Sequence, residues 1–132
     1  MTKEELSSYY YLKKEIIQIE ERIKEIDDTF LSANRINGMR YEKRLSNPQE
    51  QRMILIEKYD KRLEEKKDEA LKELMKIENF IDSINDPEIR MIFRYRYIEL
   101  MEWNKIVMLV HMSERTVYRK HREILNMAVH VS

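Results

Sequence analysis

The fold is decided by residues 103–125, which read WNKIVMLVHMSERTVYRKHREIL. Apolar residues recur at helical spacing from Trp103 to Val110, and a break of three residues follows. A second helical pattern begins after Ser113, a residue type favoured at helix N-caps. Two short helices joined by so tight a turn, the second of them basic, are typical of a helix-turn-helix.

Three positions within this stretch fit the spacing of the motif. Val107 stands where the two helices must cross, four residues before His111. His111 stands in the turn, where the backbone needs a positive φ, and histidine is enriched in the left-handed region. Val117, six residues further on, supplies the β-branched side chain that packs the second helix. Val107 is bulkier than the usual alanine, and His111 replaces the usual glycine.

Two longer helices are predicted before this motif. Residues 3–30 carry a heptad stripe of apolar residues, and residues 49–82 repeat apolar residues every seven positions. The connector 31–48 between them makes an antiparallel, coiled-coil-like hairpin the simplest arrangement. Two helices alone leave much of each stripe exposed. We therefore expect self-association through the hairpin, or packing of the C-terminal domain onto it.

Taken together, these patterns predict an all-α chain with two domains. The helical hairpin is expected over residues 1–84, and the helix-turn-helix domain over residues 85–132. Asp86 as N-cap and Pro87 at the first helical position mark the start of the second domain.

The composition excludes several classes of protein. The 132 residues include one glycine, two prolines and no cysteine, which argues against a β-sandwich, a phosphate-binding glycine loop and a thiolate metal site. No apolar run is long enough to span a membrane. The three histidines lie apart from one another and suggest no catalytic or metal site, so we expect no enzyme activity, no cofactor and no small-molecule substrate.

The neutral total charge hides a basic segment. Residues 103–122 hold five Lys or Arg residues against one acid, Glu114. Arg115 and Arg119 lie one turn apart, where both can reach guanine edges in a major groove, and Glu114 can accept from cytosine. Lys120 and Arg122 are expected to position the DNA backbone. The predicted DNA-binding residues are Ser113, Glu114, Arg115, Thr116, Tyr118, Arg119, Lys120 and Arg122.

Other basic residues leave alternatives open. Arg90, Arg94 and Arg96 precede the motif and are expected either to touch phosphates or to form structural ion pairs. The basic connector over residues 35–44 is either a solvated loop or a second contact with nucleic acid or polymerase.

The stretch 89–125 resembles region 4 of sigma-70-type factors, and resembles more closely the phage regulators of the ArpU and RinA kind. The residues that carry the resemblance are Arg96-Tyr97, Trp103 and Ser-Glu-Arg-Thr-Val at residues 113–117. The resemblance implies a phage or prophage transcription regulator that acts on late genes in the cytoplasm of a bacterial host. Its implied partner is duplex DNA, and a contact with host RNA polymerase is left open. The alternatives are a DNA-packaging protein like a small terminase subunit and a polymerase-binding factor that reads no bases.

Overall fold

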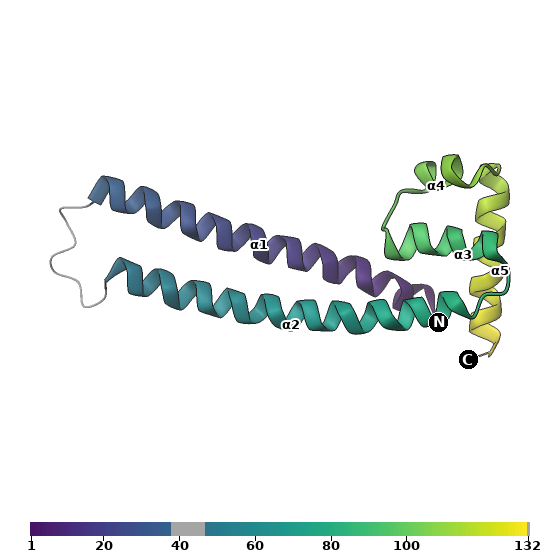
Figure 1. Ribbon diagram of the computed structural model, residues 1–132, viewed down its shortest axis with the longest axis horizontal. Coiled ribbons are helices and arrows are strands. Elements are labelled where there is room, and N and C mark those ends of the chain that lie inside the picture. The colour runs from purple at the N-terminus through teal and green to yellow at the C-terminus, as the bar shows by residue number, and fades with distance from the viewer. Residues whose placement is uncertain (38–46, 132) are drawn as a thin grey trace. The chain divides into compact units, whose positions relative to one another are not determined.

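The computed structural model describes residues 1–37 and 47–131, and the side chains of residues 1–30 and 47–127. Within these residues there are helices and no strand, so the predicted all-α class is confirmed. The elements are α1 (Lys3–Asn37), α2 (Pro48–Asp82), α3 (Pro87–Phe93), the π-helix η1 (Arg94–Ile98), α4 (Trp103–Val110) and α5 (Glu114–Val131), shown in Figure 1. Most of the connector expected over residues 35–44 lies outside the described residues.

The chain divides into two compact units. The middle unit is Lys13–Asp68, and the terminal unit combines Met1–Leu12 with Glu69–Ser132. The helices α1 and α2 therefore each contribute to both units. The domain boundary expected between residues 84 and 85 stays a prediction.

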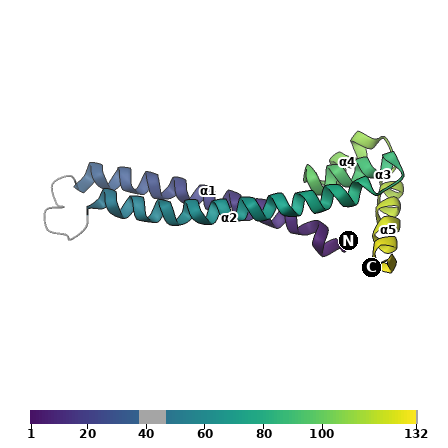
Figure 2. The ribbon, with the colours of Figure 1, turned by 60° about the horizontal axis from the view of Figure 1, so that its bottom comes forward.

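In the middle unit, α1 and α2 run side by side in opposite directions (Figures 1 and 2). Arg52 pairs with Asp27 at 2.5 Å between Nη2 and Oδ1, and Lys66 pairs with Glu15 at 3.0 Å between Nζ and Oε2. From Glu15 to Asp27 the residue number rises along α1, while the number of the partner on α2 falls from Lys66 to Arg52. This order is that of two antiparallel helices. The helix α1 continues to Asn37 rather than ending near residue 30, because residues 31–37 contain neither glycine nor proline to stop it.

The terminal unit is held by a fully buried apolar core. Leu6 from α1 and Ile77 and Ile81 from α2 are completely buried. Ser8 Oγ donates a hydrogen bond to Glu73 Oε2 at 3.0 Å, which joins the start of α1 to α2. Residues from both ends of the sequence thus form one unit.

The start of α3 follows its sequence signals. Asp86 Oδ1 accepts a hydrogen bond from the Glu88 backbone N–H at 2.8 Å, and Pro87 occupies the first turn. These are the N-cap and the first position that the sequence predicts. After α3 the helix widens into η1, where the Arg94 carbonyl accepts from the Glu99 N–H at 2.9 Å. Leu100, with φ of 58°, then turns the chain into α4.

Candidate nucleic-acid interface

Three completely buried side chains fix α3, α4 and α5 against one another. These are Ile92 of α3, Ile106 of α4 and Val117 of α5. The partly buried residues packed around them are Tyr95, Met101, Trp103, Val107, Val110 and Met112. Val117 and Val107 therefore occupy the packing positions expected of them. Because a packed core has little free volume, the orientation of α5 is set by this contact.

The turn between α4 and α5 depends on two residues. His111 adopts φ of 54° and ψ of 39°, the left-handed conformation expected at this position. Ser113 Oγ accepts a hydrogen bond from the Thr116 N–H at 3.2 Å, which confirms Ser113 as the N-cap of α5. The Ser113 and Thr116 hydroxyls also lie 2.7 Å apart. Both hydroxyls therefore stabilise the first turn of α5.

The exposed face of α5 is basic. Arg115, Arg119 and Arg122 are all exposed, and their spacing of four and three residues places them in one row along the helix. Among the described side chains, the acid that approaches this row is Glu123, with its Oε1 3.9 Å from Arg119 Nε. Such an exposed pair at the limit of contact stabilises little, so the Arg119 guanidinium is available to a partner.

Other predicted DNA-binding residues have contacts within the protein. The Tyr118 ring packs edge to face on Trp103, with centroids 5.2 Å apart, and Tyr118 is half-buried. Lys120 Nζ lies 3.3 Å from Glu88 Oε2, which connects α5 to the start of α3. Glu114 is exposed in the first turn of α5, where its charge is favourable to the helix dipole.

The inner face of α5 carries a buried histidine. His121 is 8% exposed and is the only buried polar residue among the described side chains. Its Nε2 lies 2.5 Å from the hydroxyl of Tyr97, and its ring lies 4.7 Å from that of Trp103. We assign the phenol as the donor, because a phenol O–H is more acidic than a neutral imidazole N–H. The hydrogen bond joins α5 to η1 on the side opposite the arginine row.

Burial shifts the pKa values of both partners. Desolvation, together with the smaller effects of the nearby positive charges of Lys3 and Arg96, lowers the pKa of His121 to about 4. Desolvation also raises the pKa of Tyr97 to about 12, although Arg96 opposes that rise. Both groups are therefore neutral at pH 7. The pair holds α5 in place without adding a charge to the core.

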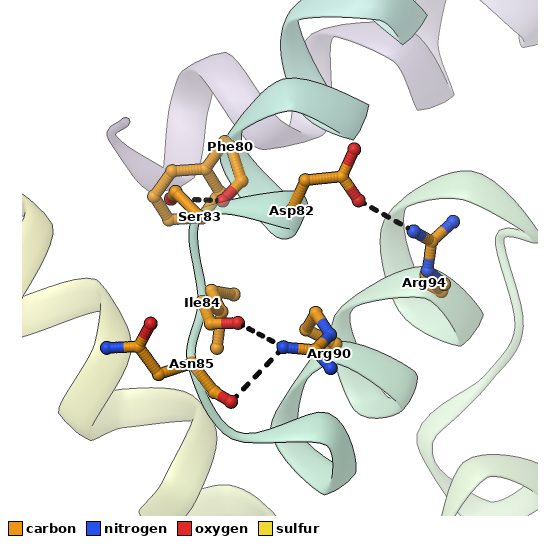
Figure 3. Close-up of polar contacts among 7 residues, drawn as sticks. All are labelled: Phe80, Asp82, Ser83, Ile84, Asn85, Arg90 and Arg94. Atoms are coloured by element: carbon orange, nitrogen blue, oxygen red, sulfur yellow. Dashed lines mark hydrogen bonds and ion pairs between the residues drawn. The ribbon is translucent and has the colours of Figure 1, made fainter.

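The three arginines before the motif all make contacts within the protein. Arg90 Nη1 donates to the carbonyl oxygens of Ile84 and Asn85 at 2.6 and 3.2 Å, as Figure 3 shows. Arg94 Nη2, at the start of η1, pairs with Asp82 at the end of α2 at 2.9 Å. The Arg90 contacts thus fix α3 to the connector after α2, and the Arg94 contact fixes η1 to α2 itself. Arg96 donates to the Met101 carbonyl at 3.0 Å, a backbone partner rather than the acidic side chain expected. Its guanidinium also lies 4.9 Å from the centre of the Trp103 ring.

The described residues contain no helix able to cross a membrane. No group of three or more His, Cys, Asp or Glu side chains in the same residues lies close enough to hold a metal ion.

The family described as "Protein of unknown function (DUF722)" matches residues 4–129 of this sequence. The chain belongs to that family. No curated protein and no solved structure matches it. The match covers residues of both compact units, so the long helices and the short ones belong to the same DUF722 sequence pattern.

Sequence reasoning found the arginine row of this DUF722 protein but missed the contacts behind it. His121 and Tyr97 are 24 residues apart and carry no common motif. The usable signal was the position of His121 one turn after Val117, on the inner face of α5. A histidine at such a position needs a buried hydrogen-bond partner, because an unsatisfied polar group in a core is costly.

Proposed function

We propose that this protein is a sequence-specific DNA-binding transcription regulator that reads duplex DNA with α5. The observation that carries the proposal is the exposed row of Arg115, Arg119 and Arg122 on a helix that follows a tight turn. A major groove admits one α-helix, and arginine pairs with guanine O6 and N7 through two hydrogen bonds. Arg115 and Arg119 are the proposed base-reading residues, and Arg122 contacts the backbone.

We interpret α4, the turn and α5 as a helix-turn-helix with α5 as the recognition helix. The left-handed His111, the Ser113 N-cap and the buried Val117 support this interpretation. Lys120 lies beside the recognition face but shares its ammonium with Glu88, so its role is limited to phosphate contact. We interpret α1 and α2 as an antiparallel coiled-coil-like hairpin that serves self-association or contact with RNA polymerase.

The regulatory class rests on the resemblance of residues 89–125 to the ArpU and RinA kind and to region 4 of sigma-70-type factors. On that ground we propose a phage or prophage protein that acts on late genes in the bacterial cytoplasm, with duplex DNA as its main partner. Its chemistry is recognition rather than catalysis, and the proposal includes no cofactor.

The proposal is tested by selecting binding sites from random duplex DNA at about 150 mM salt, because phosphate contacts make affinity depend on salt. Wild type is compared with Arg115→Ala/Arg119→Ala. The matched control is Arg22→Ala/Arg62→Ala, which removes the same charge from exposed positions of the middle unit. We expect wild type and the control to enrich one motif and the α5 variant to enrich none. On the selected site, Arg119→Ala alone should cost ~1–3 kcal/mol of binding free energy.

The same selection separates the alternatives. If folded wild type enriches no motif, base reading by α5 is wrong. Binding to purified bacterial RNA polymerase would then support the polymerase factor, and a ring of eight or more subunits would support a packaging protein. Equal loss of enrichment in the α5 variant and the control would show that total charge, rather than α5, governs DNA binding.

A further inference from the structure

Three residues on one side of α5 join this helix to the rest of the terminal unit. Val117 is completely buried, and Lys120 pairs with Glu88 at the start of α3. His121 shares a hydrogen bond with Tyr97 of η1. At about 100° per residue, Lys120 and His121 lie roughly 60° and 40° from Val117, on opposite sides of it. Contacts on both sides of a buried side chain fix the rotation of a helix about its own axis.

The arginine row faces away from these contacts. By the same spacing, Arg115, Arg119 and Arg122 lie roughly 140–200° from Val117. The ends of helical side chains lie about 6 Å from the helix axis, so a rotation of roughly 10° moves them by about 1 Å. Donor and acceptor atoms of N–H···O hydrogen bonds keep to a range of about 2.7–3.2 Å, which is narrower than this movement. The rotation of α5 therefore decides whether an arginine can pair with a base.

The two polar contacts of α5 differ in strength. The side chains of Lys120 and Glu88 are 21% and 63% exposed, so solvent weakens their ion pair. Tyr97 and His121 are 5% and 8% exposed, and their hydrogen bond measures 2.5 Å between Oη and Nε2. Leaving a buried polar group without its partner is costly. The bond between Tyr97 and His121 is therefore the stronger constraint on the rotation.

The surroundings of the His121 ring leave it little room to move. Its centroid lies 5.1 Å from that of Phe93, 5.7 Å from that of Tyr97 and 4.7 Å from that of Trp103. These three rings belong to α3, η1 and α4. The π-helix η1 presents Tyr97, and π-helices are rare and occur frequently at functional sites. A shift of the His121 ring would disturb the packing of all three elements.

We propose that Tyr97 is a positioning residue for base reading, because its hydrogen bond to His121 sets the rotation of α5 that turns the arginine row towards the bases. This role rests on the proposed function, the reading of duplex DNA by α5. It adds to that function a residue that touches no DNA and yet determines specificity. Loss of the Tyr97 hydroxyl should therefore affect the match between α5 and one sequence more than the attraction of α5 to phosphate.

The test compares wild type with Tyr97→Phe, which removes only the hydroxyl. Fluorescence anisotropy at about 150 mM salt gives the affinity for two labelled duplexes. One carries the motif that wild type selects, and the other has the same bases in scrambled order. Tyr97→Phe should bind the motif about tenfold more weakly than wild type. It should bind the scrambled duplex as wild type does, with the same salt dependence, because phosphate contacts carry no sequence information.

Two controls separate positioning from a general loss of stability. Asp86→Ala removes the exposed N-cap hydrogen bond of α3. It should lower the free energy of unfolding and keep the discrimination between the two duplexes. The second control repeats Tyr97→Phe in the Arg115→Ala/Arg119→Ala background. There it should change motif binding by less than about twofold, since effects that act through the same contact do not add.

A readout without DNA is the emission of Trp103, the only tryptophan of the chain, whose ring contacts that of His121. This emission should change in Tyr97→Phe and not in Asp86→Ala, while helicity by circular dichroism stays the same.

Four results would overturn the role of Tyr97 and leave DNA reading by α5 intact. They are wild-type discrimination in Tyr97→Phe, an equal effect of this substitution in the double-arginine background, an equal loss of discrimination in Asp86→Ala, and unchanged Trp103 emission. If wild type selects no motif, the proposed function itself is wrong, and the role of Tyr97 falls with it.

Discussion

The buried pair of His121 and Tyr97 predicts how stability changes with pH. The pKa of His121 is lowered from 6.5 to about 4 in the folded protein, so the unfolded chain binds this proton more tightly. The contribution of the neutral imidazole is therefore fully present above pH 6.5 and is lost as the pH falls towards 4. A shift of this size corresponds to about 3 kcal/mol, and about 2 kcal/mol of it is lost by pH 5.

The perturbation that isolates this effect is His121→Gln. Glutamine can accept the hydrogen bond of the Tyr97 hydroxyl but does not titrate. Urea unfolding of both proteins is followed by circular dichroism at about pH 7.5 and about pH 5. For each protein, the free energy of unfolding at pH 5 is subtracted from that at pH 7.5. Carboxylates titrate in both proteins, so their effect cancels when the two differences are compared. The free energy of unfolding of wild type should fall by about 2 kcal/mol more than that of the variant between these pH values.

Two observations would refute this reasoning. Equal losses in wild type and His121→Gln would mean that His121 is protonated as easily in the folded protein as in the unfolded chain. A large salt dependence of the difference would mean that Lys3 and Arg96, rather than desolvation, depress the pKa, because salt screens charges but not burial. Tyr97→Phe is the control, since it removes the hydrogen bond and keeps the titrating imidazole.

The remaining predictions concern single positions, each checked by urea unfolding at constant pH. His111→Gly should stabilise the protein by about 1 kcal/mol, because glycine has no steric penalty in the left-handed conformation at φ of 54°. As a control, Met108→Gly in the exposed middle of α4 should lower the free energy of unfolding by about 1 kcal/mol. A loss of stability in both variants would contradict the left-handed assignment. Asp86→Ala should cost ~1 kcal/mol through loss of the α3 N-cap, and no loss would mean that Glu88 N–H is satisfied elsewhere. Arg94→Ala should cost less than ~1 kcal/mol, since its pair with Asp82 is solvent-exposed, and a larger cost would assign it a packing role.

Local signals in the sequence were enough to predict the helix starts and the turn. Asp86 and Ser113 have side chains that cap helices, and each acts on an N–H two or three residues away. The left-handed conformation of His111 was predicted from its place in the turn, four residues after Val107, and from the enrichment of histidine in that region. Such effects need no knowledge of distant residues, which is why the sequence reveals them.

The features that escaped prediction depend on distant residues. Arg90 and Arg96 donate to backbone carbonyls, and backbone atoms carry no sequence signature. The π-helix η1 and the positive φ of Leu100 are consequences of packing, since nothing in their local sequence demands them. The inclusion of Met1–Leu12 in the terminal unit likewise follows from contacts across most of the chain.

The make-up of the terminal unit has a consequence for synthesis on the ribosome. The middle unit, Lys13–Asp68, is continuous in sequence, so it can fold as soon as it has emerged. Leu6 and Ser8 are made early, but their unit is completed only when α5 has been translated. Contacts this far apart in sequence slow folding, because a long loop must close before they form. We therefore expect the arginine row of α5 to reach its final position after the middle unit has folded.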